Sequence, residues 1–331
     1  MHIALTVVAV LVISFLFALL AKKLKFPSII GFLIAGIILG SPFVRDIVLE
    51  PNTGFVLFAG NIGFLCLMFL SGLEVSWTVL RREKMDAIYV ALFAALTPFL
   101  LGFLIFYALG FSIVTALTVG ICLSITAEAT KTRTLMDLKK LKTRIGSLMV
   151  EAGIIDDIVG ISLFVIVGFL LTESFFIEES LFLIEAIIAF LLGILLQKTL
   201  GRERISAFEK FLTFFIIPFF LVSMGIMMNM MYVVFNPLLV LIIILVAIFG
   251  KVFGTFLAKP FLKISNKKLS LVGLGMNSRG AVELVIAFIA LKAGMIPTDV
   301  YSGIVVMVII TSLLFQFALT EAVRETPRIM D

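Results

Sequence analysis

The composition of this chain is that of a protein buried in a lipid bilayer. Of its 331 residues, 62% are hydrophobic and only 14% are charged, and the formal net charge at pH 7 is +5. Soluble domains carry about 25% charged residues, so this composition excludes an ordinary soluble protein. No stretch long enough for a soluble domain remains once the apolar segments are marked. The activity is therefore expected to lie within the membrane.

Apolar segments predict a series of membrane-spanning helices. Helices are expected because lipid offers no partner to an open strand edge. The first is expected to be a retained span rather than a signal peptide, since no small-residue cleavage site precedes Lys22. The predicted fold class is an all-α polytopic membrane protein with about eleven transmembrane helices. In chain order they lie near residues 3–21, 29–40, 55–75, 88–108, 111–130, 145–171, 181–197, 211–230, 238–258, 269–291 and 299–320.

Basic residues sort to one side of this arrangement. Short cytoplasmic loops collect Lys and Arg, so we expect the N-terminus outside, the C-terminus in the cytoplasm, and the protein in the plasma membrane. Only Arg45 and Lys292 fall on the outer side, together with several acidic residues. The sorting explains the positive net charge without a nucleic-acid partner. The inner side carries Lys22, Lys23, Lys25, Arg81, Arg82, Lys84, the cluster Lys131 to Arg144, Lys198, Arg202, Arg204, Lys210, Lys259, Lys263, Lys267, Lys268, Arg324 and Arg328.

The two halves of the chain echo each other weakly. Residues 69–73 in the third span resemble residues 222–226 in the eighth, and each segment is followed by three further spans. By the span count the third helix runs inward and the eighth outward, so the repeats are inverted. We predict one transmembrane domain over residues 1–331, with an approximate first repeat at 1–171, a linker helix at 181–197 and a partial second repeat at 211–320.

One span in each half is interrupted by polar residues. The run from Phe111 gives way to Ser124-Ile125-Thr126-Ala127-Glu128, and the run from Leu269 is broken by Asn277-Ser278-Arg279-Gly280 and then by Glu283. Matching interruptions are typical of a transporter's midplane site, because unwound backbone offers carbonyls and half-helix ends as ligands. We therefore expect two discontinuous helices.

The interruptions supply candidate site residues. Thr126 and Ser124 either lie beside a bound ion or form an ordinary hydrogen bond between helices. Glu128 is expected at the positive N-terminal end of one half-helix and Arg279 at the negative C-terminal end of another. For both, and for Glu283, the expected role is compensation of the charges at the break in the helix.

The span at 145–171 carries two adjacent acids, Asp156 and Asp157, near its middle. An ionised side chain at this depth costs about 2.5–3.5 kcal/mol on insertion scales, and such residues face a bundle interior or a wet cavity. Lys251, at a similar depth in the span 238–258, is the expected partner. Neighbouring helical residues point about 100° apart, so one aspartate is expected to face Lys251 and the other a cavity.

These acids suit an exchange reaction. Two neighbouring carboxylates and an ammonium titrate as one coupled group, and the cavity-facing carboxylate can hold a proton or a bare cation but not both. Glu151, about 9 Å from Asp157 toward the cytoplasmic end of the helix, either draws cations into a funnel or is an ordinary ion-paired residue. The sequence therefore predicts an ion and proton site on this helix.

Several of these sequence elements together resemble those of a known transporter family. Six elements, in this order, resemble the two-aspartate branch of the monovalent cation:proton antiporter superfamily. The resemblance covers most of the chain. The elements are residues 26–40, the break at Thr126, residues 153–160 with the Asp-Asp pair, the span with Pro218-Phe219-Phe220, the pair Gly250-Lys251, and residues 277–283.

The resemblance implies a panel domain that dimerises and a six-helix core in which two crossed, broken helices cradle the ion. By position, Asp157 matches the family's cation and proton carrier, so Na⁺ is expected at Asp157. Asp156 and Lys251 match the mid-membrane salt bridge, and Thr126 matches the broken-helix residue beside the ion. The two-aspartate branch is associated with electrogenic exchange, whereas asparagine at the first position goes with electroneutral exchange.

The sequence departs from the family pattern in its middle. About three helices usually separate the Asp-Asp span from the Pro-Phe-Phe span, and here there is room only for the one at 181–197. The missing pair would be panel helices, which affects the expected dimer interface. No nucleotide-binding regulatory domain follows Asp331, which disfavours ligand-gated potassium efflux.

The leading hypothesis is a secondary active transporter that exchanges Na⁺ or Li⁺ for protons by alternating access, with the lipid bilayer as its surroundings and no cofactor. The alternatives are a K⁺/H⁺ antiporter, or a channel or sensor that keeps the fold without coupled exchange. An intramembrane aspartyl protease is disfavoured, because it requires catalytic aspartates on two different helices. The chain is not expected to be an enzyme.

Overall fold

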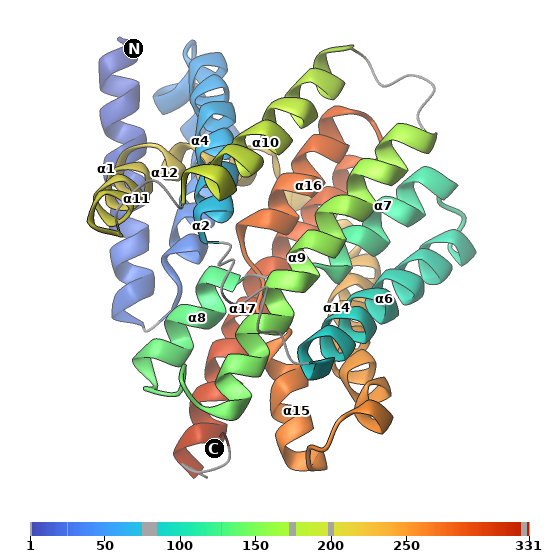
Figure 1. Ribbon diagram of the computed structural model, residues 1–331. Helices are drawn as coiled ribbons and strands as arrows, with labels where there is room; N and C mark the ends of the chain where they lie inside the picture. Colours follow the sequence, from blue (N-terminus) through green and yellow to red (C-terminus); the bar gives the residue numbers. More distant parts are fainter. Residues whose placement is uncertain are drawn as a thin grey trace. The chain divides into compact units, whose positions relative to one another are not determined.

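Every regular element in the described part of the chain is a helix (Figure 1). The computed structural model describes residues 2–24, 26–74, 85–126, 128–171, 177–197, 202–325 and 330. The prediction of an all-α fold is confirmed for these residues. Their apolar sequences favour helices because a helix satisfies its backbone hydrogen bonds within one segment, without water.

The helices form two compact units, and each unit draws on both halves of the chain. Unit 1 contains Met1–Ser76 and Phe176–Met230, and unit 2 contains Trp77–Phe175 and Met231–Asp331. The helices of unit 1 are α1 (Ile3–Lys23), α2 (Ser28–Gly40), α3 (Pro42–Val44), the π-helix η1 (Arg45–Leu49), α4 (Thr53–Glu74), α10 (Ile177–Leu196), α11 (Arg202–Phe215) and α12 (Ile217–Met227).

In unit 1, α2 packs against α12 and α1, and α4 packs against α10 and α12. Leu39 and Val222 belong to a cluster of buried apolar side chains between these helices. α2 and α12 approach each other closely at Gly36 of α2 and Gly225 of α12. A Cβ atom on Gly36 would lie 2.3 Å from the carbonyl oxygen of Val222, and one on Gly225 would lie 2.5 Å from that of Leu33. Only glycine fits at this crossing.

The Gly225→Ala variant tests this crossing. Forcing a methyl group between two helix backbones should cost at least about 1–3 kcal/mol, the usual cost of overpacking, and should lower the unfolding temperature of the purified protein. Gly54→Ala is the matched control, because no atom lies within 4 Å of a Cβ built at that helical glycine. The control should unfold at the wild-type temperature or slightly above it. Equal unfolding temperatures for the two variants would contradict the assigned packing.

Unit 2 contains two triplets of the same design, each a helix, a broken helix and a helix. The first is α6 (Met85–Ala108), the pair α7 (Ile113–Ser124) and α8 (Glu128–Asp137), and α9 (Arg144–Leu171). The second is α14 (Pro237–Leu257), the pair α15 (Asn266–Gly275) and α16 (Ala281–Lys292), and α17 (Thr298–Glu325). Two short helices complete the unit, α13 (Met230–Phe235) and the 3₁₀-helix η2 (Lys259–Phe261).

The two triplets share one hydrophobic core. α6 packs against α14, α9 against α6 and α15, and α14 against α17. The buried cluster takes Ala91 from α6, Met149 from α9, Leu271 from α15 and Phe315 from α17. The break after α7, which begins at Ile125, and the break at 276–280 both fall where polar residues interrupt the sequence. The predicted discontinuous helices are therefore present in unit 2.

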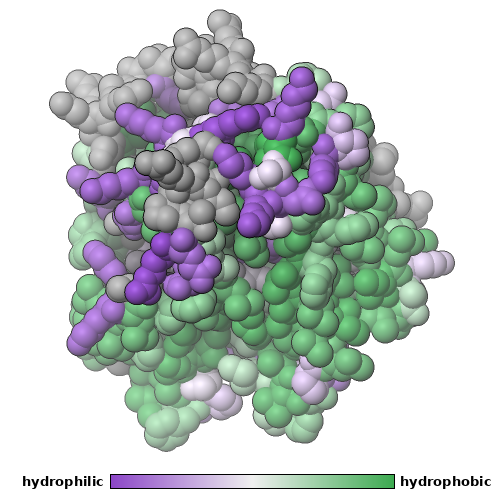
Figure 2. All heavy atoms as spheres, turned by 90° about the horizontal axis from the view of Figure 1, so that it is seen from below, coloured by the Kyte–Doolittle hydropathy of each residue, from purple (hydrophilic) through white to green (hydrophobic). Residues whose placement is uncertain are grey.

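The apolar helices support the prediction of a multi-pass membrane protein. Six helices in the described part of the chain are long and apolar enough to cross a bilayer, or seven if the bent pair Ser28–Gly40 and Pro42–Leu49 is one span. The pieces of the two broken helices are shorter. The count of eleven spans stays a prediction. Figure 2 shows hydrophilic side chains gathered in one region of the face seen from below, and hydrophobic side chains over a large part of the same face.

The span predicted at 211–230 corresponds to the candidate span Lys210–Met227. A turn at Ile216, with φ −110° and ψ −49°, divides it into α11, which ends at Phe215, and α12, which begins at Ile217. One detail of the sequence interpretation was wrong: Lys131, assigned to a basic loop cluster, lies in α8 and is fully buried. Hydropathy does not detect a lysine that is turned inward.

Candidate ion site

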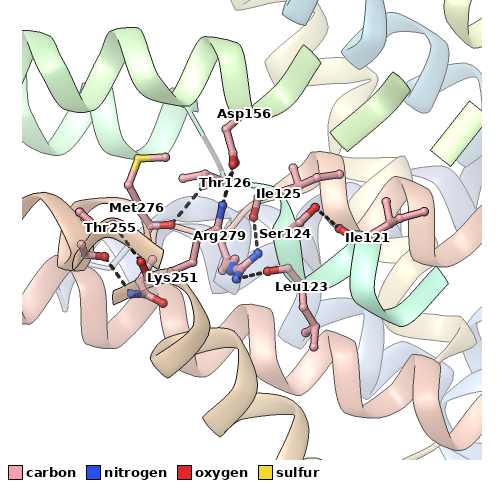
Figure 3. Close-up of polar contacts among 12 residues, drawn as sticks. Ile121, Leu123, Ser124, Ile125, Thr126, Asp156, Lys251, Thr255, Met276 and Arg279 are labelled. Carbon is pink, nitrogen blue, oxygen red and sulfur yellow. Dashed lines mark hydrogen bonds and ion pairs between the residues drawn. The ribbon is translucent and has the colours of Figure 1, made fainter. Parts of the chain in front are cut away.

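A buried ion pair joins α9 to α14. The ammonium nitrogen of Lys251 lies 2.8 Å from Oδ1 and 2.9 Å from Oδ2 of Asp156, and both side chains are fully buried. Figure 3 shows Asp156 pointing from its helix toward this ammonium group. Each charge is costly to bury by itself, so the two stabilise each other at this depth.

Asp157 is the next residue after this pair's aspartate on α9. It therefore projects about 100° from Asp156, and its side chain is only partly buried. Glu151 lies on the same helix, nearly two turns nearer its N-terminus, and is also partly buried. One of the two adjacent acids is thus paired with lysine, and the other projects from a different face of the helix.

The first broken helix ends beside α9. α7 stops at Ser124, Ile125 is extended at φ −79° and ψ 151°, and α8 begins at Glu128. A Cβ atom on Gly160 of α9 would lie 2.2 Å from Cγ1 of Ile125. Glycine at this position, one turn after Asp156 and Asp157, lets the unwound break approach the acids.

The two breaks are joined by a hydrogen bond. The hydroxyl of Thr126 donates to the carbonyl oxygen of Met276 at 3.2 Å, which links the first break to the second (Figure 3). Ser124, the other hydroxyl proposed for the site, donates to Ile121 of its own helix at 2.8 Å. The structure therefore brings Thr126, but not Ser124, into a contact between the two broken helices.

Arg279 closes the C-terminal end of α7. Its guanidinium group is fully buried and donates to the carbonyl oxygens of Leu123 at 2.7 Å, of Cys122 at 3.4 Å and of Ile125 (Figure 3). The last carbonyls of a helix have no partner within the helix and carry a partial negative charge. The guanidinium group thus lies at the C-terminal end of α7, and its role in charge compensation stays a prediction.

The structure shows the side-chain contacts of Glu283 but not those of Glu128. Glu283 is fully buried in the first turn of α16, and its Oε1 accepts a hydrogen bond from the backbone N–H of Gly280 at 2.6 Å. A carboxylate is favourable at this positive helix end. Glu128 is the first residue of α8, and its side chain lies outside the described set.

Sequence reasoning missed two further residues of this region. Ser312 of α17 donates to the carbonyl oxygen of Arg279 at 2.8 Å and holds the second break from its other side. The only sequence signal was a polar pair, Thr311-Ser312, inside an apolar span. The buried Lys131 lies with its ammonium nitrogen 3.9 Å from the sulfur of Met276. A buried lysine ammonium group therefore lies beside the second break, and the assignment of Lys131 to a loop had missed it.

The Asp156–Lys251 pair gives a test of stability. Lys251→Met leaves the carboxylate buried without its partner and should lower the free energy of unfolding by about 3–5 kcal/mol. The Asp156→Leu/Lys251→Met double variant should recover most of that loss, because apolar replacement of a whole buried pair is often neutral. Denaturant unfolding in detergent measures both. Lys142→Met, at an exposed position before α9, should have no effect. A stable Lys251→Met variant would contradict the pairing.

Two triplets that each contain a broken helix, a hydrogen bond between the two breaks and a buried ion pair between apolar helices are together typical of a secondary transporter of small ions. A family model described as the transmembrane domain of sodium/hydrogen exchangers matches residues 10–189 and 163–324. The chain belongs to this sodium/hydrogen exchanger family. Its members are transporters that exchange a monovalent cation for protons, which places this chain among multi-pass membrane antiporters.

Individual relatives agree with this membership. The chain is 26% identical to the Na⁺/H⁺-K⁺ antiporter GerN of Bacillus cereus over 349 positions, with 89% of each chain covered. It is also 26% identical to a Na⁺/H⁺ antiporter of Enterococcus hirae, covering 89% of this chain and 91% of the relative. Both alignments are longer than this chain of 331 residues, so the relatives contain residues without a counterpart here.

A solved structure shares the fold. The sodium proton antiporter MjNhaP1 from Methanocaldococcus jannaschii aligns with a TM-score of 0.69 and 18% sequence identity, covering 96% of this chain and 95% of that one. At this identity the likeness concerns the fold alone. It confirms the predicted antiporter-like architecture.

Proposed function

We infer that this chain exchanges Na⁺ for protons across the membrane by alternating access, with Asp157 as the carrier of both. The observation that supports this most is the different environment of the two adjacent aspartates. Asp156 is held in a buried ion pair with Lys251, whereas Asp157 is partly exposed on the same helix. A partly exposed carboxylate in this position can bind a proton or a cation.

The chemistry of exchange follows from one carboxylate. Asp157 binds either a proton or a dehydrated cation, since the same oxygens hold both, so uptake of one releases the other. Thr126 offers a hydroxyl oxygen and unwound backbone beside the crossing, and oxygen ligands suit hard alkali cations. Glu151 extends the acidic surface of α9 toward one side and draws cations to the site.

The finer features of the reaction come from the family resemblance. Na⁺ is the preferred cation, with Li⁺ as a close substitute, and potassium is not favoured. The two adjacent aspartates support electrogenic exchange. The distribution of Lys and Arg supports a plasma-membrane protein with its N-terminus outside and its C-terminus in the cytoplasm. The dimerising panel domain that the resemblance implies supports a homodimer.

Reconstituted transport tests the function. In proteoliposomes with an imposed pH gradient, added NaCl should dissipate the gradient, and LiCl should do so comparably. KCl should have a smaller effect. A membrane voltage should change the rate of electrogenic exchange. Sodium current without coupled proton movement would instead identify a channel, and the absence of any sodium-dependent proton flux would contradict the proposal.

A further inference from the structure

The break between α15 and α16 contains a buried amide that the sequence analysis assigned no role. Asn277 lies in this unwound stretch, two residues after the last residue of α15, and only 4% of its surface is exposed. Its neighbour Met276 accepts the hydrogen bond from Thr126. Asn277 thus directly follows the residue whose hydrogen bond with Thr126 joins the two breaks.

The orientation of this amide follows from its donors. The Nδ2 group donates to the carbonyl oxygen of Gly273 at 2.9 Å and to that of Ile248, in α14, at 3.4 Å. Turning the amide over would place its oxygen against two other acceptors, which repel it. The position of the Oδ1 atom is therefore determined by the hydrogen bonds of the Nδ2 group.

The Oδ1 atom is a buried acceptor that receives no hydrogen bond from any described residue. Leaving such an oxygen without a partner costs free energy, and a polar group in this condition in a folded protein calls for an occupant such as a water molecule or an ion. On the far side of the same break, Oε2 of Glu283 is also buried and accepts no hydrogen bond within the described set. The unwound stretch and the first turn of α16 thus each present a buried acceptor oxygen without a donor among the described residues.

The surroundings of Asn277 connect it to the charged residues of the site. The carbonyl oxygen of Ile248, which accepts the longer of its two hydrogen bonds, belongs to α14, three residues before Lys251. Figure 3 shows Met276, Thr126 and Lys251 grouped at the crossing, with Asp156 directed toward the same place. Asn277 therefore links the second break to the helix that carries the lysine.

We propose that Asn277 Oδ1 is a ligand of the transported cation, and this rests on the proposed Na⁺/H⁺ exchange. Asp157 supplies the charge that a desolvated cation requires, and Asn277 supplies a neutral oxygen from the second broken helix. A neutral ligand replaces one water of the hydration shell without adding a group that protons compete for. Asn277 thereby sets cation affinity and selectivity more than the rate of proton release.

Two substitutions separate the oxygen from the donors. Asn277→Ser removes the amide oxygen but keeps a short hydroxyl that can donate to Gly273. Asn277→Asp removes both amide donors but keeps an acceptor oxygen. In proteoliposomes containing the full chain, the serine variant should need about tenfold more Na⁺ for half-maximal proton flux, with a maximal rate near wild type. The aspartate variant should stay close to the wild-type Na⁺ requirement at alkaline pH, where protons no longer compete for the added carboxylate.

A second readout does not depend on transport. NaCl should raise the unfolding temperature of the detergent-solubilised wild type, and the serine variant should need about tenfold more NaCl for the same shift. The matched control is Asn266→Ser, an exposed asparagine in the first turn of α15, which should leave both measurements unchanged.

The outcomes distinguish this proposal from the proposed function. If both Asn277 variants need equally more Na⁺ for half-maximal flux, the amide matters through the hydrogen bonds that its Nδ2 group donates. The proposal that its oxygen is a ligand is then wrong. A wild-type Na⁺ requirement in the serine variant also overturns it, because the oxygen then holds water only, and Na⁺/H⁺ exchange itself still stands. Absence of sodium-dependent flux in the wild-type protein overturns the exchange function together with this ligand.

Discussion

Replacing Asp157 with asparagine is expected to abolish sodium-dependent proton flux in proteoliposomes. Asparagine has nearly the same shape, but it carries no charge and takes up no proton at the pH of the assay. A unit charge 4 Å from a cation contributes about 4 kcal/mol at an effective dielectric constant of 20, which corresponds to about a thousandfold in cation affinity. The flux should fall to that of protein-free liposomes.

The Asp157→Asn experiment needs a control that removes a charge elsewhere in unit 2. Asp299, in the first turn of α17, accepts a hydrogen bond from the backbone N–H of Val300 at 2.8 Å, and an asparagine oxygen can accept the same bond. Asp299→Asn should therefore transport at the wild-type rate. Exchange at the wild-type rate in Asp157→Asn would show that the carrier is another group.

Some of the site could be predicted because membrane burial restricts the options for a charged side chain. Asp156 and Lys251 lie 95 positions apart in sequence, yet both fall near mid-span, and a mid-membrane charge requires an opposite charge. The same reasoning placed Arg279 at the negative end of a half-helix. These predictions depended only on depth and charge, both of which can be read from an apolar sequence.

Other features depended on packing that a sequence does not display. The partner of Thr126 is a backbone carbonyl 150 positions away, and carbonyl groups are present at every residue, so no pattern identifies the one that is used. The burial of Lys131 depends on which face of α8 turns inward, and a run of basic residues gave no sign of it. The end of α11 at Phe215 occurs in an apolar run whose one local signal is Pro218, in the first turn of α12.

Removing the Arg279 guanidinium should have the largest effect on stability. It donates to the carbonyl oxygens of Cys122 and Leu123 in the last turn of α7 and of Ile125 directly after it. Each hydrogen bond to a charged group is worth about 1.5–3 kcal/mol. Proteins of ordinary stability unfold with about 5–15 kcal/mol, so Arg279→Leu should lose most of its folded population. Size-exclusion profiles and unfolding temperatures in detergent would measure this loss.

The conservative variant Arg279→Lys separates charge from geometry. Lysine keeps the positive charge at the negative end of α7, but its ammonium group cannot spread donors over several carbonyls as the planar guanidinium does. We therefore expect Arg279→Lys to fold with a lowered unfolding temperature and to transport slowly. Arg324→Leu is the control, because that side chain is 80% exposed in a weak ion pair near the end of α17 and should tolerate the change. If Arg279→Leu were as stable and active as wild type, the broken helix would not depend on this cap, and the crossing would have to be held by Thr126 and Ser312 alone.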